Sequence, residues 1–146
     1  MSPLPPQPIS PLDGRYRAAV EGLGEYLSEA GLNKARVHVE IEWLIFLSER
    51  GVFGSEAPSA EQTAALRAWA ADFGQAEIDE LATLEATTRH DVKAVEYLVR
   101  GALAKNGLDR LAELTHFACT SEDINNLSYG VTLRAALHEV WLPKFR

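Results

Sequence analysis

The sequence predicts an all-α fold. Apolar residues recur at spacings of three and four along most of the chain, and residues that cap helices bound these segments. A single segment alternates apolar and polar residues as a strand does, and no other segment is a convincing partner strand. The composition is that of a folded chain, because 47% of the 146 residues are hydrophobic and 24% are charged.

The chain begins with a proline-rich segment, and we expect residues 1–14 to form an extended arm. Proline fixes φ and removes an amide donor, while Leu12, Asp13 and Gly14 provide a turn. The segment has neither the basic nor the apolar region of a signal peptide. Regular structure is therefore expected from about Arg15 onward.

One segment carries two conflicting patterns. Val37, Val39 and Ile41 alternate with polar residues, as in a half-buried strand. Val37 and Ile41 also fall on one helical face with Leu44 and Ile45. We favour a helix because an isolated strand would lack a partner. The acidic pairs and clusters at Glu40/Glu42 and at residues 77–80 are interpreted as solvated faces.

Capping residues predict a helix after Ser59. Ser59 and Gln62 have the spacing of a capping box, and Gly74 is expected to end the helix in the left-handed conformation. A shorter stripe at Ile78, Leu81 and Ala82 predicts the next helix. The apolar face of the helix after Ser59 consists of Leu66, Trp69, Ala70 and Phe73.

Two further helices are predicted from the same spacing. Thr88 and Asp91 precede an apolar stripe that stops at Asn106-Gly107, a typical helix end. Thr120 and Asp123 precede a long helix whose apolar stripe we expect to be exposed in this chain taken alone. The chain ends at residue 146 without a cap, so we expect it to stop inside an element. The stripe of the long helix consists of Ile124, Leu127, Val131, Ala135 and His138.

Charge and cysteine content exclude several classes of function. Fourteen basic against 21 acidic residues give a formal net charge of −7. An acidic surface repels nucleic-acid phosphates and anionic lipids, so neither is an expected partner. The longest apolar run, residues 43–47, is far shorter than the ~20 residues of a membrane span. A single cysteine, Cys119, excludes an internal disulfide and favours a reducing, cytoplasmic location.

Two polar clusters near predicted helix starts are candidates for anion binding. Arg15 offers a planar fork of donors for phosphate or carboxylate, and Tyr16 adds a hydroxyl. His90 and Asp91 lie at a helix N-terminus, where free amides and the helix dipole favour anions. The alternatives are an exposed arginine beside a packed tyrosine, and simple capping by Thr88 and Asp91 with a surface histidine.

A third polar cluster surrounds the start of the last helix. The hydroxyls of Thr120 and Ser121, beside free helix amides, suit a carboxylate, and Asn125 is unfavourable in a helix unless its amide is bonded. The alternative is capping by Thr120, with Asn125 and Asn126 solvated or hydrogen-bonded between helices. His116 and Cys119 supply only half of a tetrahedral ligand set, so no metal site is expected. We interpret Cys119 as a protonated structural cysteine because its neighbours are apolar.

Three motifs together resemble the adenylosuccinate lyase family of the fumarase/aspartase superfamily. They are residues 10–16 (SPLDGRY), 87–97 (TTRHDVKAVEY) and 116–126 (HFACTSEDINN). The resemblance implies a helical N-terminal domain over residues 15–108. It further implies that residues 109–146 are the truncated start of a central helix-bundle domain, which assembles as a homotetramer.

The resemblance also implies an activity. Enzymes of this family are carbon–nitrogen lyases of purine biosynthesis that cleave adenylosuccinate to AMP and fumarate, and succinyl-carboxamide ribotide likewise, by β-elimination without metal or cofactor. Their catalytic acid and base would lie beyond residue 146, so this chain alone is expected to be inactive and to hold no catalytic residue.

By the same resemblance, three pairs of residues would bind the substrate. One pair would hold the substrate phosphate, one would contact the base and the succinyl group, and one would bind a succinyl carboxylate. Arg89 replaces the asparagine that is usual in this family and is a further candidate contact. The three pairs are, in that order, Arg15 and Tyr16, His90 and Asp91, and Thr120 and Ser121.

Two other readings of the sequence stay open. The exposed stripe of the last helix would suit a helical interaction module that pairs with partner helices. The other reading is a sister lyase that acts on argininosuccinate or a related fumarate adduct, and the proposed phosphate anchor at Arg15 discriminates between the two substrates.

Overall fold

The structure is a computed structural model that describes residues 9–145, and it contains helices and turns with no strand in this range. The predicted all-α fold is confirmed. Residues 1–8, which make up most of the predicted extended arm, lie outside the described range. The α-helices are α1 (Arg17–Val20), α2 (Gly24–Leu27), α3 (Glu29–Glu49), α4 (Ala60–Ala71), α5 (Gln75–Thr88), α6 (Asp91–Lys105) and α7 (Ser121–Ala135).

Shorter helical turns connect or extend these helices. Three 3₁₀ turns lie between them: η1 (Glu21–Leu23), η2 (Val52–Gly54) and η3 (Asp109–Leu114). After α7 the helical path continues through a π-helical segment and a last 3₁₀ turn, η4 (Ala136–Trp141) and η5 (Leu142–Phe145). None of the helices within residues 9–145 has the length and apolar character to cross a bilayer.

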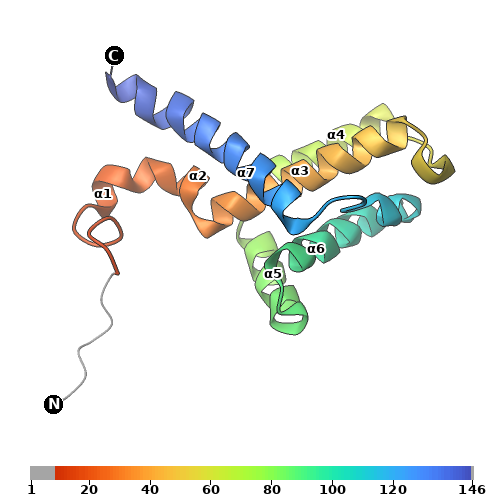
Figure 1. Ribbon diagram of the computed structural model, residues 1–146, viewed down its shortest axis with the longest axis horizontal. Helices are drawn as coiled ribbons and strands as arrows, with labels where there is room; N and C mark the ends of the chain where they lie inside the picture. The colour runs from red at the N-terminus through yellow and green to blue at the C-terminus, as the bar shows by residue number, and fades with distance from the viewer. Residues whose placement is uncertain (1–8, 146) are drawn as a thin grey trace.

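Helix α3 is the centre of the molecule. It packs against α4, α6 and α7, and Figure 1 shows it running through the middle with α4 alongside. Because α3 is covered on several sides, Val37, Val39 and Ile41 are all buried. This burial explains the alternating pattern, and it confirms the helix over the strand. The core around α3 includes Leu44, Ile45, Leu66, Ala70, Val95, Leu98, Val99 and Leu103.

The predicted start of α4 is confirmed, but its predicted end is wrong. Ser59 Oγ accepts from the Gln62 amide at 3.1 Å, and Gln62 Oε1 accepts from the Ser59 amide at 3.0 Å. Helix α4 ends before Gly74, whose φ of −146° is extended and not left-handed. The Gly74 amide instead donates to Glu77 Oε2 at 3.0 Å. Gly74 is therefore the N-cap of α5.

The start of α6 also differs from the prediction. The chain reverses at Arg89, whose φ is 50°, so Thr88 ends α5 and does not cap α6. His90 is the N-cap, and its Nδ1 accepts from the Lys93 amide at 3.1 Å. The predicted end is confirmed, since Gly107 has a φ of 66° and terminates the helix.

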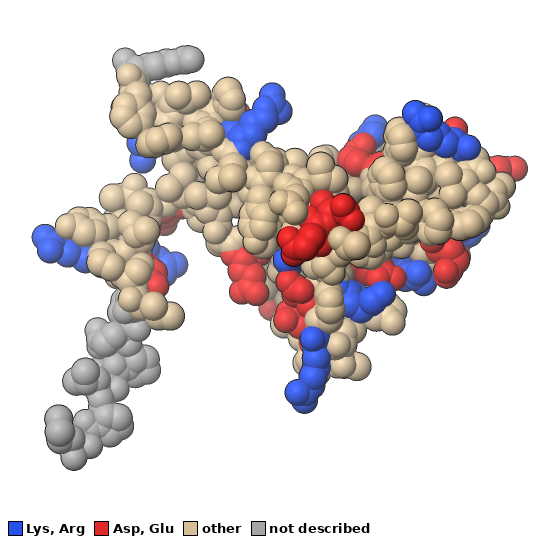
Figure 2. All heavy atoms as spheres, viewed as in Figure 1, with Lys and Arg blue, Asp and Glu red and all other residues tan. Residues whose placement is uncertain are grey.

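Helix α7 turns small residues toward α3 and large apolar residues outward. Ser128, Thr132 and Ala136 are buried with Ile124, at spacings of four. Of the predicted stripe, Leu127 is 60% and Val131 43% exposed. In Figure 2 the atoms over α7 and its continuation, at upper left, are mostly uncharged. The expected exposure of the apolar stripe is confirmed for Leu127 and Val131, but it is wrong for Ile124, which is buried against α3.

Candidate functional site

A buried arginine joins two of the three predicted polar clusters. Arg36, on α3, is only 4% exposed. Its Nη2 donates to Asp91 Oδ2 at 2.8 Å, and its Nε donates to Asn125 Oδ1 at 2.9 Å. A third bond runs from Nη1 to Asn33 Oδ1 on the same helix, at 2.9 Å. The first turns of α6 and α7 are therefore fixed to one guanidinium.

Asp91 opens α6 and keeps an exposed carboxylate. Partial burial alone would raise the pKa of this carboxyl, but the Val92 amide and the Arg36 guanidinium outweigh burial and lower the pKa below its ordinary value. Asp91 is therefore ionised at neutral pH. His90 lies beside it, with Nδ1 3.7 Å from Asp91 Oδ1. Because His90 Nδ1 accepts from the Lys93 amide, the neutral ring carries its proton on Nε2, which has no hydrogen-bond partner among residues 9–145 and can donate to a ligand.

At the start of α7 the two predicted hydroxyls have different roles. Asp123 Oδ2 accepts from the Thr120 amide at 2.7 Å and from Thr120 Oγ1 at 2.9 Å. These bonds hold the pKa of the Asp123 carboxyl below its usual value. The hydroxyl proton of Thr120 is thus used in capping, whereas the Ser121 hydroxyl has no hydrogen-bond partner among residues 9–145. Ser121 is the better donor to a ligand.

The loop before α7 is held by a second buried charge on α3. Glu40 Oε2 accepts from the His116 amide at 2.9 Å, and Glu40 Oε1 lies 2.6 Å from His116 Nδ1. Burial raises the pKa of the Glu40 carboxyl, although the His116 bonds oppose this effect. The loop is also anchored by Trp43 Nε1, which donates to the Phe117 carbonyl at 2.8 Å. The prediction that Glu40 lies on a solvated face is wrong, because Glu40 is fully buried.

Cys119 lies in the same loop and is partly buried. Burial, together with the negative charges of Glu40 and Asp123, raises the pKa of its thiol. A thiol with a raised pKa is a poor nucleophile at neutral pH. The interpretation of Cys119 as a protonated structural residue is therefore supported.

The first predicted cluster lies apart from the other two in this chain. Arg15 and Tyr16 are exposed in the turn before α1, with the guanidinium 5.2 Å from the centre of the tyrosine ring. That turn is built as predicted, because the Ser10 amide donates to Asp13 Oδ1 at 2.7 Å. Figure 1 shows α1 at the left of the molecule, away from α5 and α6. Arg89 is exposed in the reversal between α5 and α6.

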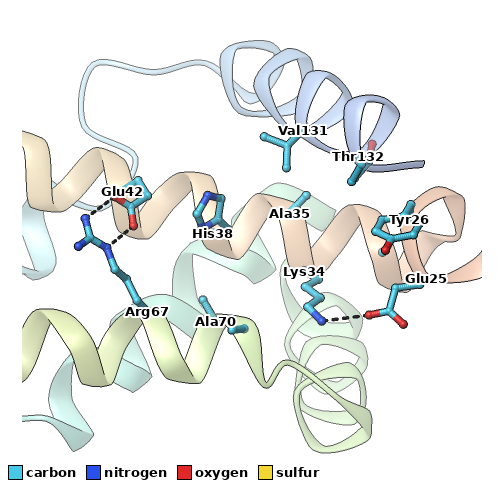
Figure 3. Close-up of a pocket in the computed structure, with 13 residues that line it drawn as sticks. Glu25, Tyr26, Lys34, Ala35, His38, Glu42, Arg67, Ala70, Val131 and Thr132 are labelled. Atoms are coloured by element: carbon cyan, nitrogen blue, oxygen red, sulfur yellow. Dashed lines mark hydrogen bonds and ion pairs between the residues drawn. The ribbon is translucent and has the colours of Figure 1, made fainter. Parts of the chain in front are cut away.

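A separate cavity of about 370 Å³ lies on the other side of α3. Figure 3 shows α3 in its middle, with Arg67 of α4 on one side and Val131 of α7 on the other. Arg67 forms a two-bond ion pair with Glu42, at 2.6 and 2.7 Å. None of the predicted binding residues lines this cavity. The helical period explains this separation, since His38 and Glu42 point about 200° away from Arg36 and Glu40 around α3.

Arg36 and Glu40 are the site residues that sequence analysis missed. Both are charged, and both lie four residues apart inside the most apolar helix of the chain. Charged residues at that spacing share one helical face. Two charged residues on one face of an apolar helix are therefore the pattern that could have predicted a buried polar network.

The chain is similar to several proteins named adenylosuccinate lyase. The one from Escherichia coli (strain K12) is 44% identical over 141 residues, which cover 94% of this chain and 31% of that protein. The Haemophilus influenzae protein is 43% identical over 140 residues, with the same coverage of 94% and 31%. The Legionella pneumophila (strain Corby) protein is 38% identical over 138 residues, covering 92% of this chain and 30% of its own length.

These similarities confirm the resemblance that the three motifs indicated. No protein-family model matches the chain. The chain spans about 31% of the length of the curated relatives it matches, so the comparison relates it to a part of such an enzyme.

Proposed function

We propose, from the premise that this chain is related to part of adenylosuccinate lyase, that it supplies substrate-binding surface to a carbon–nitrogen lyase. The reaction is cleavage of adenylosuccinate to AMP and fumarate, and of succinyl-carboxamide ribotide to its carboxamide and fumarate. The observation that carries the proposal is the guanidinium of Arg36, which ties the Asp91 and Asn125 ends of two motifs together at 2.8 and 2.9 Å. Two of the three motifs of the family thus form one polar corner.

Each polar group of this corner suits a part of the substrate. His90 Nε2 is a donor suited to the base or to a succinyl oxygen, and the ionised Asp91 suits an amino group. Ser121 is suited to a succinyl carboxylate, because its hydroxyl and the first amides of α7 are donors. Arg89 brings a second cation near this corner. Its left-handed φ of 50° is a conformation that asparagine adopts more readily, which agrees with the asparagine usual in this family.

The phosphate is assigned to Arg15 and Tyr16. In a single chain this pair lies apart from the corner at α6 and α7, so we propose that another copy of the chain completes the site in a cytoplasmic homotetramer. The exposed apolar face of α7 supports such an assembly. In the same scheme, residues 15–108 form the N-terminal domain and residues 109–146 begin the bundle domain.

The proposed chemistry requires donors where charge develops. β-Elimination removes a proton next to a carboxylate, and the electrons left behind spread into that carboxylate. A hydroxyl aimed at it, as Ser121 is proposed to be, stabilises the transition state more than the ground state. The acid and base of the reaction would come from chain outside residues 1–146.

The test is fumarate release from adenylosuccinate by the complete protein that contains this chain. Replacing Ser121 with alanine should lower kcat by about a hundredfold with a smaller change in KM, because one oxyanion donor is worth about 3 kcal/mol. Ser128→Ala is the matched control, since the Ser128 hydroxyl is buried and donates to the Ile124 carbonyl at 2.7 Å. An unchanged kcat in Ser121→Ala would remove Ser121 from its proposed role.

Two alternative functions make different predictions. If Arg15→Ala leaves KM unchanged, the substrate lacks the phosphate, and a sister lyase such as argininosuccinate lyase is favoured. An interaction module is supported by the exposed Leu133 and Trp141 on the outer side of α7 and η4. Calorimetric titration of the complete protein with AMP and with fumarate separates these cases, because an interaction module would bind neither.

A further inference from the structure

Arg36 differs from an ordinary core ion pair in how its partners are exposed. The arginine is 4% exposed, while the side chain of its charged partner, Asp91, is 49% exposed. In an ion pair of the core both charges are shielded from water, at a desolvation cost that can exceed their attraction. Here the buried partner supports a carboxylate that faces solvent at the proposed binding corner.

The bonding pattern of Arg36 also links separate elements. Its planar fork reaches α6 through Asp91 and α7 through Asn125, residues that lie 55 and 89 positions away in the chain. Asp91 uses Oδ2 for the arginine and keeps Oδ1 on the side of His90. Asn125 uses Oδ1 for the arginine, and its Nδ2 donates to Glu122 at 3.0 Å. Both side chains are therefore fixed in one orientation.

We infer that Arg36 is a positioning residue of the proposed site, whose guanidinium sets the orientation of the Asp91 carboxylate and the distance between the starts of α6 and α7. The inference rests on the proposed function, because Asp91 matters to activity only if this corner binds substrate. Lysine does not replace arginine in this role, since its single ammonium lacks the planar fork that reaches three acceptors.

The kinetic test is a double-mutant cycle in the complete protein. Arg36→Lys should lower kcat/KM for fumarate release by about tenfold or more, since misplaced binding groups are costly. Asp91→Asn should also lower it. In the double variant, kcat/KM should be no more than about twofold lower than in the worse single variant, because both changes disrupt the same contact between Arg36 and Asp91. Additive losses would overturn the inference.

A matched arginine on the other side of α3 provides the control. Arg67 also holds a carboxylate through two bonds and also joins two helices, but its pair is exposed and lies away from the proposed corner. Arg67→Lys should change kcat/KM by less than about twofold, and its effect should add to that of Asp91→Asn. If Arg67→Lys and Asp91→Asn were as non-additive in kcat/KM as Arg36→Lys and Asp91→Asn, the losses would reflect general stability, and the inference would be overturned.

Two measurements keep the inference testable if Arg36→Lys folds poorly or the proposed activity is absent. Asn125→Ala removes one acceptor without burying an unpaired charge, and it should show the same non-additivity with Asp91→Asn. Independently, carbon NMR of the Asp91 carboxyl in the 146-residue chain should show its pKa rise in Arg36→Lys and stay unchanged in Arg67→Lys. A wild-type complete protein that releases no fumarate overturns the proposed function, and the NMR titration alone then decides the positioning. An unchanged Asp91 titration in Arg36→Lys overturns the inference in either case.

Discussion

Replacement of Glu40 tests whether the loop before α7 depends on a carboxylate buried in α3. Glu40 is fully buried, its Oε2 accepts from the His116 amide at 2.9 Å, and its Oε1 is hydrogen-bonded to His116 Nδ1 at 2.6 Å. Glu40→Ala leaves the His116 amide without its acceptor. Glu40→Gln keeps the length of the side chain and one acceptor oxygen.

The expected loss of stability follows from these contacts. A hydrogen bond to a charged group is worth about 1.5–3 kcal/mol. The one methylene group that alanine removes together with the carboxyl group is worth about 0.8 kcal/mol. Relief of the burial of the carboxylate offsets part of this loss. We therefore expect Glu40→Ala to lower the free energy of unfolding by about 3 kcal/mol, and Glu40→Gln to lower it by about 1 kcal/mol below pH 4.5, where its effect is largest.

The assay is urea denaturation of the 146-residue chain, followed by far-ultraviolet circular dichroism across pH. Burial raises the folded pKa of Glu40 above the ordinary 4.5, so protonation stabilises the folded state. The advantage of wild type over Glu40→Gln is then largest below pH 4.5 and is lost as the pH rises through the folded pKa.

Glu42→Ala, which breaks an exposed ion pair, should cost less than about 1 kcal/mol. Equal losses in Glu40→Ala and Glu42→Ala would refute the reasoning.

Two glycines give further predictions about stability. Gly31→Ala should destabilise the chain by about 1–2 kcal/mol, because the new Cβ would lie 2.4 Å from the Glu25 carbonyl oxygen and force α2 away from α3. Calorimetric melting checks this, and a higher melting temperature would contradict the close approach. Gly107→Ala should cost about 1 kcal/mol from its left-handed φ of 66° alone, since a Cβ there meets open space. Asparagine at this position should recover part of that loss in the same assay, whereas a loss equal to that of alanine would argue against backbone strain.

Local hydrogen bonds explain what the sequence could predict. The Ser59–Gln62 capping box closes within four residues, and the helix end at Gly107 depends on one left-handed residue. Where two helices follow each other closely, the same local signals become ambiguous. Gly74 could end one helix or begin the next, and the hydrogen bond from its amide to Glu77 shows that it begins α5. At α6 the capping spacing points to Thr88, but the reversal of the chain at Arg89 makes His90 the N-cap.

The candidate site depended on contacts that are distant along the chain. Thr120, Ser121, His90 and Asp91 were predicted from helix starts, which are local features. The buried link between these starts was not predictable in the same way, because the partners of Arg36 lie 55 and 89 residues away. Charged residues in an apolar helix indicate a buried network, but their partners can be identified only from the packing of α6 and α7 on α3.

Helix α7 joins the proposed binding corner to the proposed assembly. Its N-terminal end carries Ser121 and, one turn later, the Arg36 partner Asn125, while its outer side exposes Leu133 and, in η4, Trp141. The face toward α3 uses small residues such as Ser128, which allow close packing and fix the helix against rotation. Because a helix is stiff along its axis, a partner that covers the outer face also constrains the first turn. Substrate binding at Ser121 and coverage of the apolar face are therefore expected to stabilise one another through a single helix, with Arg36 as its fixed point on α3.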